Sequence, residues 1–153
     1  MVFLKGVAVR GAACIALQLA FVACVAASDW IVPYRISNDE ISAPLSSHPG
    51  DAVRGREVFV GRDGNCLLCH SVPETGTRFM GNLGPQLSGI GARLNAGQLR
   101  LRIVDSQRLN VNTIMPPYYR TEGLESVAAA WQGRPALTAQ QIEDVIAYLQ
   151  TLR

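Results

Sequence analysis

The sequence predicts an all-α domain in which three to four helices wrap around one covalently bound group. Apolar residues recur at helical spacing in separate stretches of the chain. A long run rich in glycine and proline lies between those stretches and favours loops over a sheet. Two cysteines followed directly by a histidine supply a point of covalent attachment for the bound group.

The first 27 residues predict a secretory signal peptide. Lys5 and Arg10 give a positive start, residues 11–26 are almost wholly apolar, and small residues precede Ser28. We therefore expect cleavage before Ser28 and a periplasmic mature chain without a membrane span. The tetrapeptide ending at Cys24 loosely resembles a lipoprotein cleavage site, which leaves lipidation there as a minor alternative.

The mature chain is balanced in charge. Cleavage of the signal peptide removes Lys5 and Arg10, so twelve arginines remain against twelve acidic residues. This balance gives no basic field for nucleic acid. Cys66 and Cys69 are the only cysteines beyond the signal, so no pair is left for a structural disulfide once they hold a bound group. A domain of roughly 100 residues buries a modest fraction of its surface, and the bound group must then form part of the core.

Residues 28–48 show neither helical nor alternating periodicity and predict an extended arm before a single domain at 49–153. The apolar side chains of Trp30, Ile31 and Tyr34 suggest that the arm docks on a partner. A loose N-terminal tail is the alternative.

The first predicted helix covers residues 51–60. Asp51 follows Pro-Gly and is suited to cap the helix, and Ala52, Gly55 and Phe59 fall on one face. Glycine inside a helix costs about 1 kcal/mol relative to alanine. We therefore expect another helix to approach closely at Gly55.

Residues 66–70 carry the pattern Cys-x-x-Cys-His, which is typical of c-type haem attachment. In this pattern Cys66 and Cys69 form thioethers with the porphyrin, and His70 is the proximal ligand of the iron. A zinc site is an alternative, but it needs four donors, and the mature chain adds only His48 to these three residues. A thioredoxin-like redox pair would follow a hydrophobic strand, whereas a Gly-Arg-Asp-Gly segment precedes this motif.

The next stretch, residues 71–97, predicts loops that wrap the edge of the haem. Residues 98–109 predict a second helix, whose inner face carries Leu99, Ile103 and Val104. Arginines occupy the rest of its surface. We expect these arginines, Arg93, Arg100, Arg102 and Arg108, to form a solvated face, with a docking surface for an acidic partner or anionic substrate group as the alternative.

Met115 is the predicted sixth ligand of the iron. Two prolines follow it and stiffen its loop, because proline fixes φ near −65°. The alternatives are Met80, an open sixth position, or a buried methionine that only fills space. His48 is expected to be an exposed linker residue.

Two further helices are predicted before the C-terminus. Residues 123–131 are expected to form a short helix. The last helix begins at Thr138, which forms a capping box with Gln141, and it carries an apolar stripe from Ile142 to Leu149. We expect this C-terminal helix to cross the first helix at Gly55.

The order of these motifs resembles class I cytochrome c. The haem motif, the segment Gly84-Pro-Gln-Leu87, the segment Thr113-Ile-Met-Pro116 with the following Tyr-Tyr-Arg, and the C-terminal helix from Leu137 are similar to the SoxX family, the monohaem subunits of SoxAX sulfur-oxidation cytochromes. The resemblance covers roughly residues 50–153. It implies a class I cytochrome c fold and a hydrogen bond from the proximal histidine to the carbonyl oxygen of Pro85.

The resemblance also implies an activity. SoxAX, an L-cysteine S-thiosulfotransferase, couples thiosulfate oxidatively to a cysteine of the SoxYZ carrier, and the family assigns the sulfur chemistry to a SoxA-like subunit with its own haem or haems. The SoxX-like chain would accept the electrons and pass them to a small soluble cytochrome c. A free-standing periplasmic electron shuttle and a ligand-binding haem protein are the alternatives. An iron held by both His70 and Met115 favours electron transfer over the binding of small ligands and over catalysis at the haem.

Overall fold

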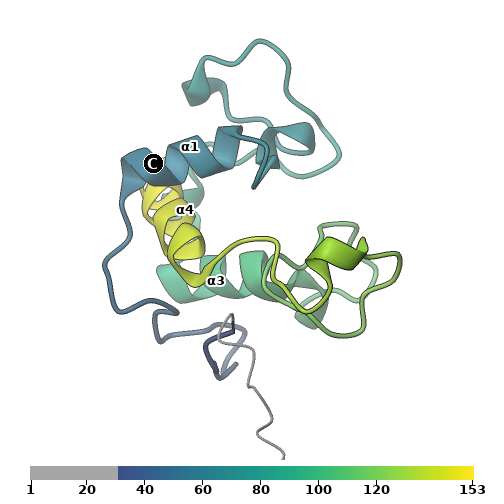
Figure 1. Cartoon of the computed structure of the whole chain (residues 1–153). Coiled ribbons are helices and arrows are strands. Elements are labelled where there is room, and N and C mark those ends of the chain that lie inside the picture. The colour runs from purple at the N-terminus through teal and green to yellow at the C-terminus, as the bar shows by residue number, and fades with distance from the viewer. Residues whose placement is uncertain (1–30) are drawn as a thin grey trace, which may run out of the picture.

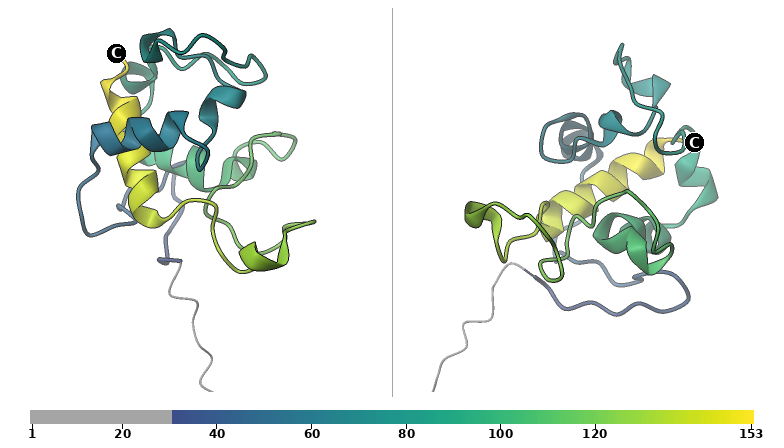
Figure 2. Two further views of the ribbon diagram at one scale, coloured as in Figure 1. Left: turned by 45° about the horizontal axis from the view of Figure 1, so that its top comes forward. Right: turned by 90° about the vertical axis from the view of Figure 1, so that its right-hand side faces the viewer.

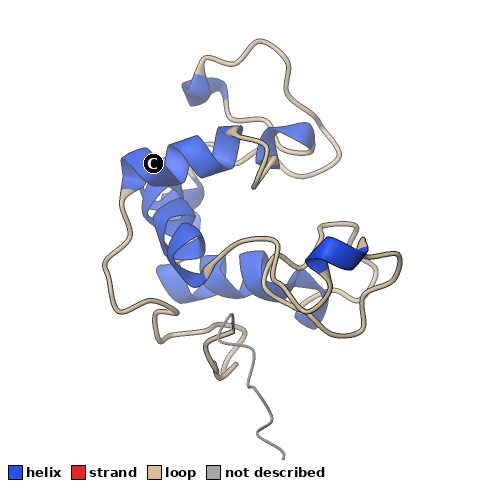
Figure 3. Ribbon diagram, viewed as in Figure 1, coloured by secondary structure: helices blue, strands red, loops and turns tan. Residues whose placement is uncertain are grey.

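The computed structural model describes residues 31–153 and confirms the all-α class (Figures 1 and 3). Its α-helices are α1 (Ala52–Val60), α2 (Ile90–Arg93), α3 (Ala96–Asp105) and α4 (Ala139–Thr151). Short 3₁₀ turns are η1 (Cys66–Leu68), η2 (Pro73–Thr75), η3 (Ser106–Arg108) and η4 (Ala129–Trp131). Within residues 31–153, β-structure is limited to an isolated bridge between Ser37 and Glu40, and no helix is long and apolar enough to cross a membrane. The predicted signal peptide, Cys24 and Trp30 lie outside the described residues.

Helices α1 and α4 cross in close contact, as predicted (Figure 2). A Cβ atom on Gly55 would lie 1.8 Å from the carbonyl oxygen of Asp144 in α4, so only glycine fits at the crossing. The Asp51 side chain caps α1 by accepting hydrogen bonds from the backbone N–H groups of Val53 and Arg54. Beside the crossing, Phe59 packs against Tyr148 with ring centroids 5.4 Å apart.

Helix α4 follows the sequence prediction closely. Thr138 and Gln141 form the expected reciprocal capping box. The apolar side chains of this region are buried in the core: Leu137, Ile142, Val145, Ile146, Leu149 and Leu152. The helix therefore supplies the central surface on which α1 and α3 pack.

Helix α3 begins and ends earlier than predicted, and η3 continues the chain to Arg108. Its expected inner residues are buried, but Arg100 is also buried, with a residue exposure of 3%. The prediction of a solvated arginine face is therefore wrong at Arg100. The guanidinium binds Glu143 of α4 through two hydrogen bonds of 2.7 and 2.8 Å, and it also donates to the carbonyl oxygen of Ile41. These bonds compensate the burial of both charges.

The arm packs on its own chain. Ile41 and Leu45 are buried in the core, and the backbone N–H of Ile41 donates to the carbonyl oxygen of Gly97 at the start of α3. Tyr34 packs against Tyr119, with ring centroids 6.3 Å apart, and Ile31 is partly buried against the core. The arm is therefore not a loose tail, and the side chains of Ile31 and Tyr34 pack against their own chain.

A helix prediction at 123–131 and a loop prediction at 71–97 are wrong. Residues 123–131, which were predicted to form a short helix, contain a single 3₁₀ turn at Ala129–Trp131, because the segment has no side-chain cap and Gly123 and Ser126 adopt positive φ. The run at 71–97 contains α2, which the sequence pattern did not reveal because four residues make little more than one turn. Gly91 in α2 donates its backbone N–H to the carbonyl oxygen of Leu152, which ties the loop to the end of α4.

Candidate functional site

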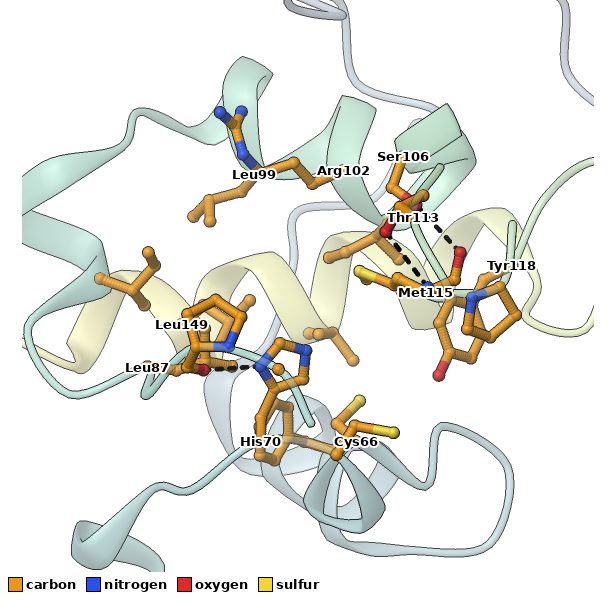
Figure 4. Close-up of a pocket in the computed structure, with 18 of the residues that line it drawn as sticks. Cys66, His70, Leu87, Leu99, Arg102, Ser106, Thr113, Met115, Tyr118 and Leu149 are labelled. Atoms are coloured by element: carbon orange, nitrogen blue, oxygen red, sulfur yellow. Dashed lines mark hydrogen bonds between the residues drawn. The ribbon is translucent and has the colours of Figure 1, made fainter. Parts of the chain in front are cut away.

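A cavity of about 380 Å³ lies between the segment that follows α1 and the segment that follows α3 (Figure 4). Most of its lining is apolar and comes from α2, α3, α4 and the loops. This lining includes Phe59, Leu83, Leu87, Ile90, Leu94, Leu99, Ile103, Leu109, Ile114, Leu137, Val145 and Leu149. All five predicted site residues, Cys66, Cys69, His70, Pro85 and Met115, also line it. The volume lies within the range of cofactor pockets, roughly 300–1,000 Å³.

The imidazole of His70 is held in one orientation. Its Nδ1 atom lies 2.7 Å from the carbonyl oxygen of Pro85, which is the hydrogen bond that the resemblance implied. Because a carbonyl oxygen only accepts, Nδ1 carries the proton and Nε2 keeps its lone pair for a metal. A Cβ on Gly84 would lie 2.4 Å from Cε1 of the ring, so glycine at this position lets the chain pass against the imidazole.

The two cysteines lie at one edge of the cavity on the turn η1. The backbone N–H groups of Cys69 and His70 both donate to the carbonyl oxygen of Cys66, which brings the three residues onto one tight turn. Burial raises the pKa of the Cys66 thiol to about 12, so this thiol is neutral at physiological pH before it reacts. The Tyr118 hydroxyl donates to the carbonyl oxygen of Gly64 at 2.8 Å and holds the start of the motif against the Met115 loop.

Met115 enters the cavity from the side opposite His70, with its sulfur directed inward (Figure 4). Its backbone is fixed at both ends. The Ser106 hydroxyl donates to the Met115 carbonyl oxygen at 3.0 Å, and the Met115 N–H donates to Oγ1 of Thr113 at 3.2 Å. The two following prolines add to this rigidity.

The alternative ligands lie elsewhere. The Met80 sulfur accepts a hydrogen bond from the backbone N–H of Val72 at 3.1 Å, and Met80 is absent from the cavity lining. His48 is exposed, and its Nδ1 contacts the Ser47 hydroxyl at 3.4 Å. Within residues 31–153, no cluster of three or more His, Cys, Asp or Glu side chains is arranged to hold a metal ion.

Arg102 is a site residue that the sequence analysis assigned to the solvated helix face. It lies three residues after Leu99, and both line the cavity. Among the lining residues it carries the only Arg, Lys, Asp or Glu side chain. It lies across the cavity from Cys66 (Figure 4), and its guanidinium donates to the carbonyl oxygen of Gln98 at 2.9 Å. The helical spacing from Leu99 was the signal that placed it near the inner face.

Comparison with known proteins identifies the family. Residues 52–153 match the family model described as Cytochrome c. The chain belongs to the cytochrome c family. It is also similar to a chain in the crystal structure of SoxXA from P. pantotrophus, with 30% sequence identity and a TM-score of 0.72 over 78% of this chain and 93% of that chain. Among curated proteins no significant sequence match was found.

Together these similarities show a SoxX-like class I cytochrome c with four α-helices and covalently bound haem c. The cavity fits this cofactor. It offers two thiols at one edge, apolar walls for the porphyrin, and an arginine across from the thiols. An imidazole nitrogen and a thioether sulfur face the cavity from opposite sides, which is the donor set of cytochromes c (Figure 4).

Proposed function

We propose that this cytochrome is the electron-transfer subunit of a SoxAX-type L-cysteine S-thiosulfotransferase. It accepts the electrons released when thiosulfate is coupled to a cysteine of a SoxYZ carrier and passes them to a small soluble cytochrome c. The observation that carries the proposal is the similarity to the SoxXA structure over 93% of that chain. The chain is then part of an enzyme without catalysing the sulfur step itself.

Each predicted site residue has a role in this proposal. Cys66 and Cys69 would form the thioethers, and His70 and Met115 would hold the iron. The Pro85 carbonyl oxygen orients His70 through the 2.7 Å contact and, by accepting a hydrogen bond from Nδ1–H, raises the basicity of the other ring nitrogen.

The bound haem supplies a reversible one-electron change between ferric and ferrous iron. The residues around it limit the site to that change. His70 and Met115 would both hold the iron, which would leave no open coordination site for a reactant. A thioether ligand favours the ferrous state and raises the reduction potential. The hydrogen bonds from Ser106 and to Thr113 keep the Met115 loop in place during the change.

We propose that Arg102 binds a haem propionate. The thioethers fix the vinyl edge of the porphyrin at Cys66 and Cys69, and Arg102 lies on the opposite side of the cavity (Figure 4). A guanidinium pairs well with a carboxylate, and no other Arg, Lys, Asp or Glu side chain lines the cavity.

The proposed permanent partner is a SoxA-like subunit with one or two haems. Leu83 and Ile114 line the cavity from its two sides and are 68% and 73% exposed, which leaves apolar surface beside the haem. Apolar surface of this kind suits a permanent interface better than a brief encounter. The predicted export signal supports a periplasmic location for the proposed complex.

Co-expression with a SoxA-like subunit in a host that matures c-type cytochromes tests this proposal. We expect the two chains to co-purify as a stable heterodimer. In that complex, the haem of this chain should become reduced after thiosulfate and a SoxYZ carrier are added together. Leaving out the carrier should prevent the reduction. A chain that stays monomeric and exchanges electrons only with respiratory cytochromes would instead be a free-standing shuttle.

A further inference from the structure

A second cluster of charged side chains lies at the end of α3, around the carboxylate of Asp105. Asp105 is 1% exposed, and its oxygens lie 3.2 and 3.4 Å from one guanidinium nitrogen of Arg120. The Nε atom of Arg108 lies 3.6 Å from the same carboxylate. Two cations therefore share one anion, which leaves an excess positive charge in a partly buried region.

The cluster also has more hydrogen-bond donors than acceptors. The Nε atom of Arg120 is buried and has no hydrogen-bond partner within the described part of the chain. Tyr34 lies beside the cluster, where burial and the nearby Asp105 carboxylate raise the pKa of its phenol. A buried donor without an acceptor is destabilising, so a partner for it is expected. The carboxylate of Asp105 already accepts from the backbone N–H of Gln107.

We propose that Arg108 and Arg120 form a binding site for an oxyanion, with Tyr34 at its edge. An oxyanion supplies both the missing acceptor and the missing negative charge, and guanidinium groups bind such anions through directed hydrogen bonds. The oxyanion is either a small free anion such as sulfate or thiosulfate, or a carboxylate of a partner protein. This site is separate from the haem cavity, because none of Tyr34, Asp105, Arg108 and Arg120 lines that cavity.

The place of the cluster gives the site a connection to the haem environment. Arg120 follows the Met115 loop directly, and Tyr119 before it bonds back to α3 through the carbonyl oxygen of Val104. Asp105 immediately precedes Ser106, whose hydroxyl holds the carbonyl of Met115. An anion bound here would join the two segments that position Met115.

The test uses the mature, haem-loaded protein in its diamagnetic ferrous state. Sulfate and thiosulfate are titrated at constant ionic strength against chloride, and the arginine Nε–H signals are followed by NMR. We expect the Arg120 Nε–H signal to shift and saturate. Arg120→Gln should weaken binding at least tenfold. Arg108→Gln should also weaken binding at least tenfold. Because the Arg108 side chain is 64% exposed, this second variant should still fold.

The control is Arg62→Gln, which removes an equal charge from an exposed arginine elsewhere and should leave binding unchanged. Adding a SoxA-like subunit separates the two sources. If the subunit shifts the Arg120 signal and blocks anion binding, the natural occupant is a partner carboxylate; otherwise it is the free anion. If neither titration nor partner shifts the Arg120 signal, a buried water satisfies Nε and the proposal is overturned. Saturable binding that survives in both arginine variants also overturns it.

Discussion

Arg100 and Glu143 form a charged pair at 4% and 7% side-chain exposure, where they join α3, α4 and the arm. Glu143 also accepts the backbone N–H of Leu45, so its two oxygens satisfy three donors. Because the charge of each residue is compensated by the other, removing one of the two charges leaves the other buried without a counter-charge.

Glu143→Gln should therefore lower the free energy of unfolding by roughly 3–5 kcal/mol, since it leaves the Arg100 guanidinium buried without a counter-charge. Urea unfolding of the haem-loaded protein measures the change. Glu57→Gln makes the same substitution at an exposed position of α1 and should change stability by less than about 0.5 kcal/mol. Equal effects of the two substitutions would show that the buried pair contributes nothing specific.

The carboxyl group of Asp144 is expected to make the free energy of unfolding depend on pH. Burial raises the pKa of its carboxyl, but hydrogen bonds from the Arg54 guanidinium, the Asp51 backbone N–H and the Gln140 amide together hold the pKa below the usual 3.8. The folded state then favours the ionised form. The stabilising contribution of Asp144 should be complete above pH 3.8 and should be lost as the pH falls through the lower folded value.

Unfolding titrations at a series of pH values, for the parent and for Asp144→Asn, measure this dependence. The stability difference between the two proteins should be constant at neutral pH and should shrink in acid. A difference that stays constant down to the lowest pH would contradict the assigned hydrogen bonds.

Single residues divide into those that the sequence predicts and those that it does not. Cys66, His70 and Met115 were singled out by their chemistry and spacing, and they line one cavity. Arg100 was placed wrongly, because an arginine in a helix is normally solvated. Its compensating partner lies 43 residues away, and no local pattern marks that pairing.

Among the elements, the crossing of α1 and α4 depends on one position. Gly55→Ala would gain about 1 kcal/mol from helix propensity alone. However, the new Cβ would lie 1.8 Å from the Asp144 carbonyl oxygen, so the helices must separate. We expect a net loss of stability and a lower yield of haem-loaded protein, measured by thermal unfolding and by haem absorbance per chain.

The control for the crossing is Val53→Ala, which changes a residue of the same helix that is 71% exposed. This substitution should leave both the yield and the unfolding temperature close to those of the parent. If Gly55→Ala proved as stable as Val53→Ala, the close approach would not limit the packing.

Elements with strong caps and an apolar stripe could be predicted, and those without them could not. The capping box at Thr138 fixed the start of α4, and Asp51 fixed the start of α1. The segment 123–131 has no side-chain cap and forms mainly loop. Helix α2 is held by contacts with the end of α4, including the bond from Gly91 to Leu152, which a local sequence pattern does not contain.

For the whole molecule, the cavity sets a requirement for the cofactor. The cavity is lined mostly by apolar side chains, and these would face solvent without the haem. The haem is therefore expected to complete the core, as the short length of the domain suggested.

The double variant Cys66→Ala with Cys69→Ala should accordingly lose covalent haem and cooperative unfolding together. Haem staining after denaturing electrophoresis and calorimetric unfolding measure the two losses. The control is Leu68→Ala, because Leu68 lies between the cysteines and is 65% exposed. This variant should keep both the covalent haem and the cooperative unfolding. A haem-free double variant with a sharp unfolding transition at the parent temperature would contradict the role of the haem in the core.

Ligation of the iron by both His70 and Met115 can be measured through the absorption of the ferric protein. The parent should show the far-red charge-transfer band of methionine-ligated haem and should resist carbon monoxide when reduced. Met115→Ala should lose the band and bind carbon monoxide readily, whereas Met80→Ala should keep the band. A band that survives in Met115→Ala, or one that disappears in Met80→Ala, would contradict the account.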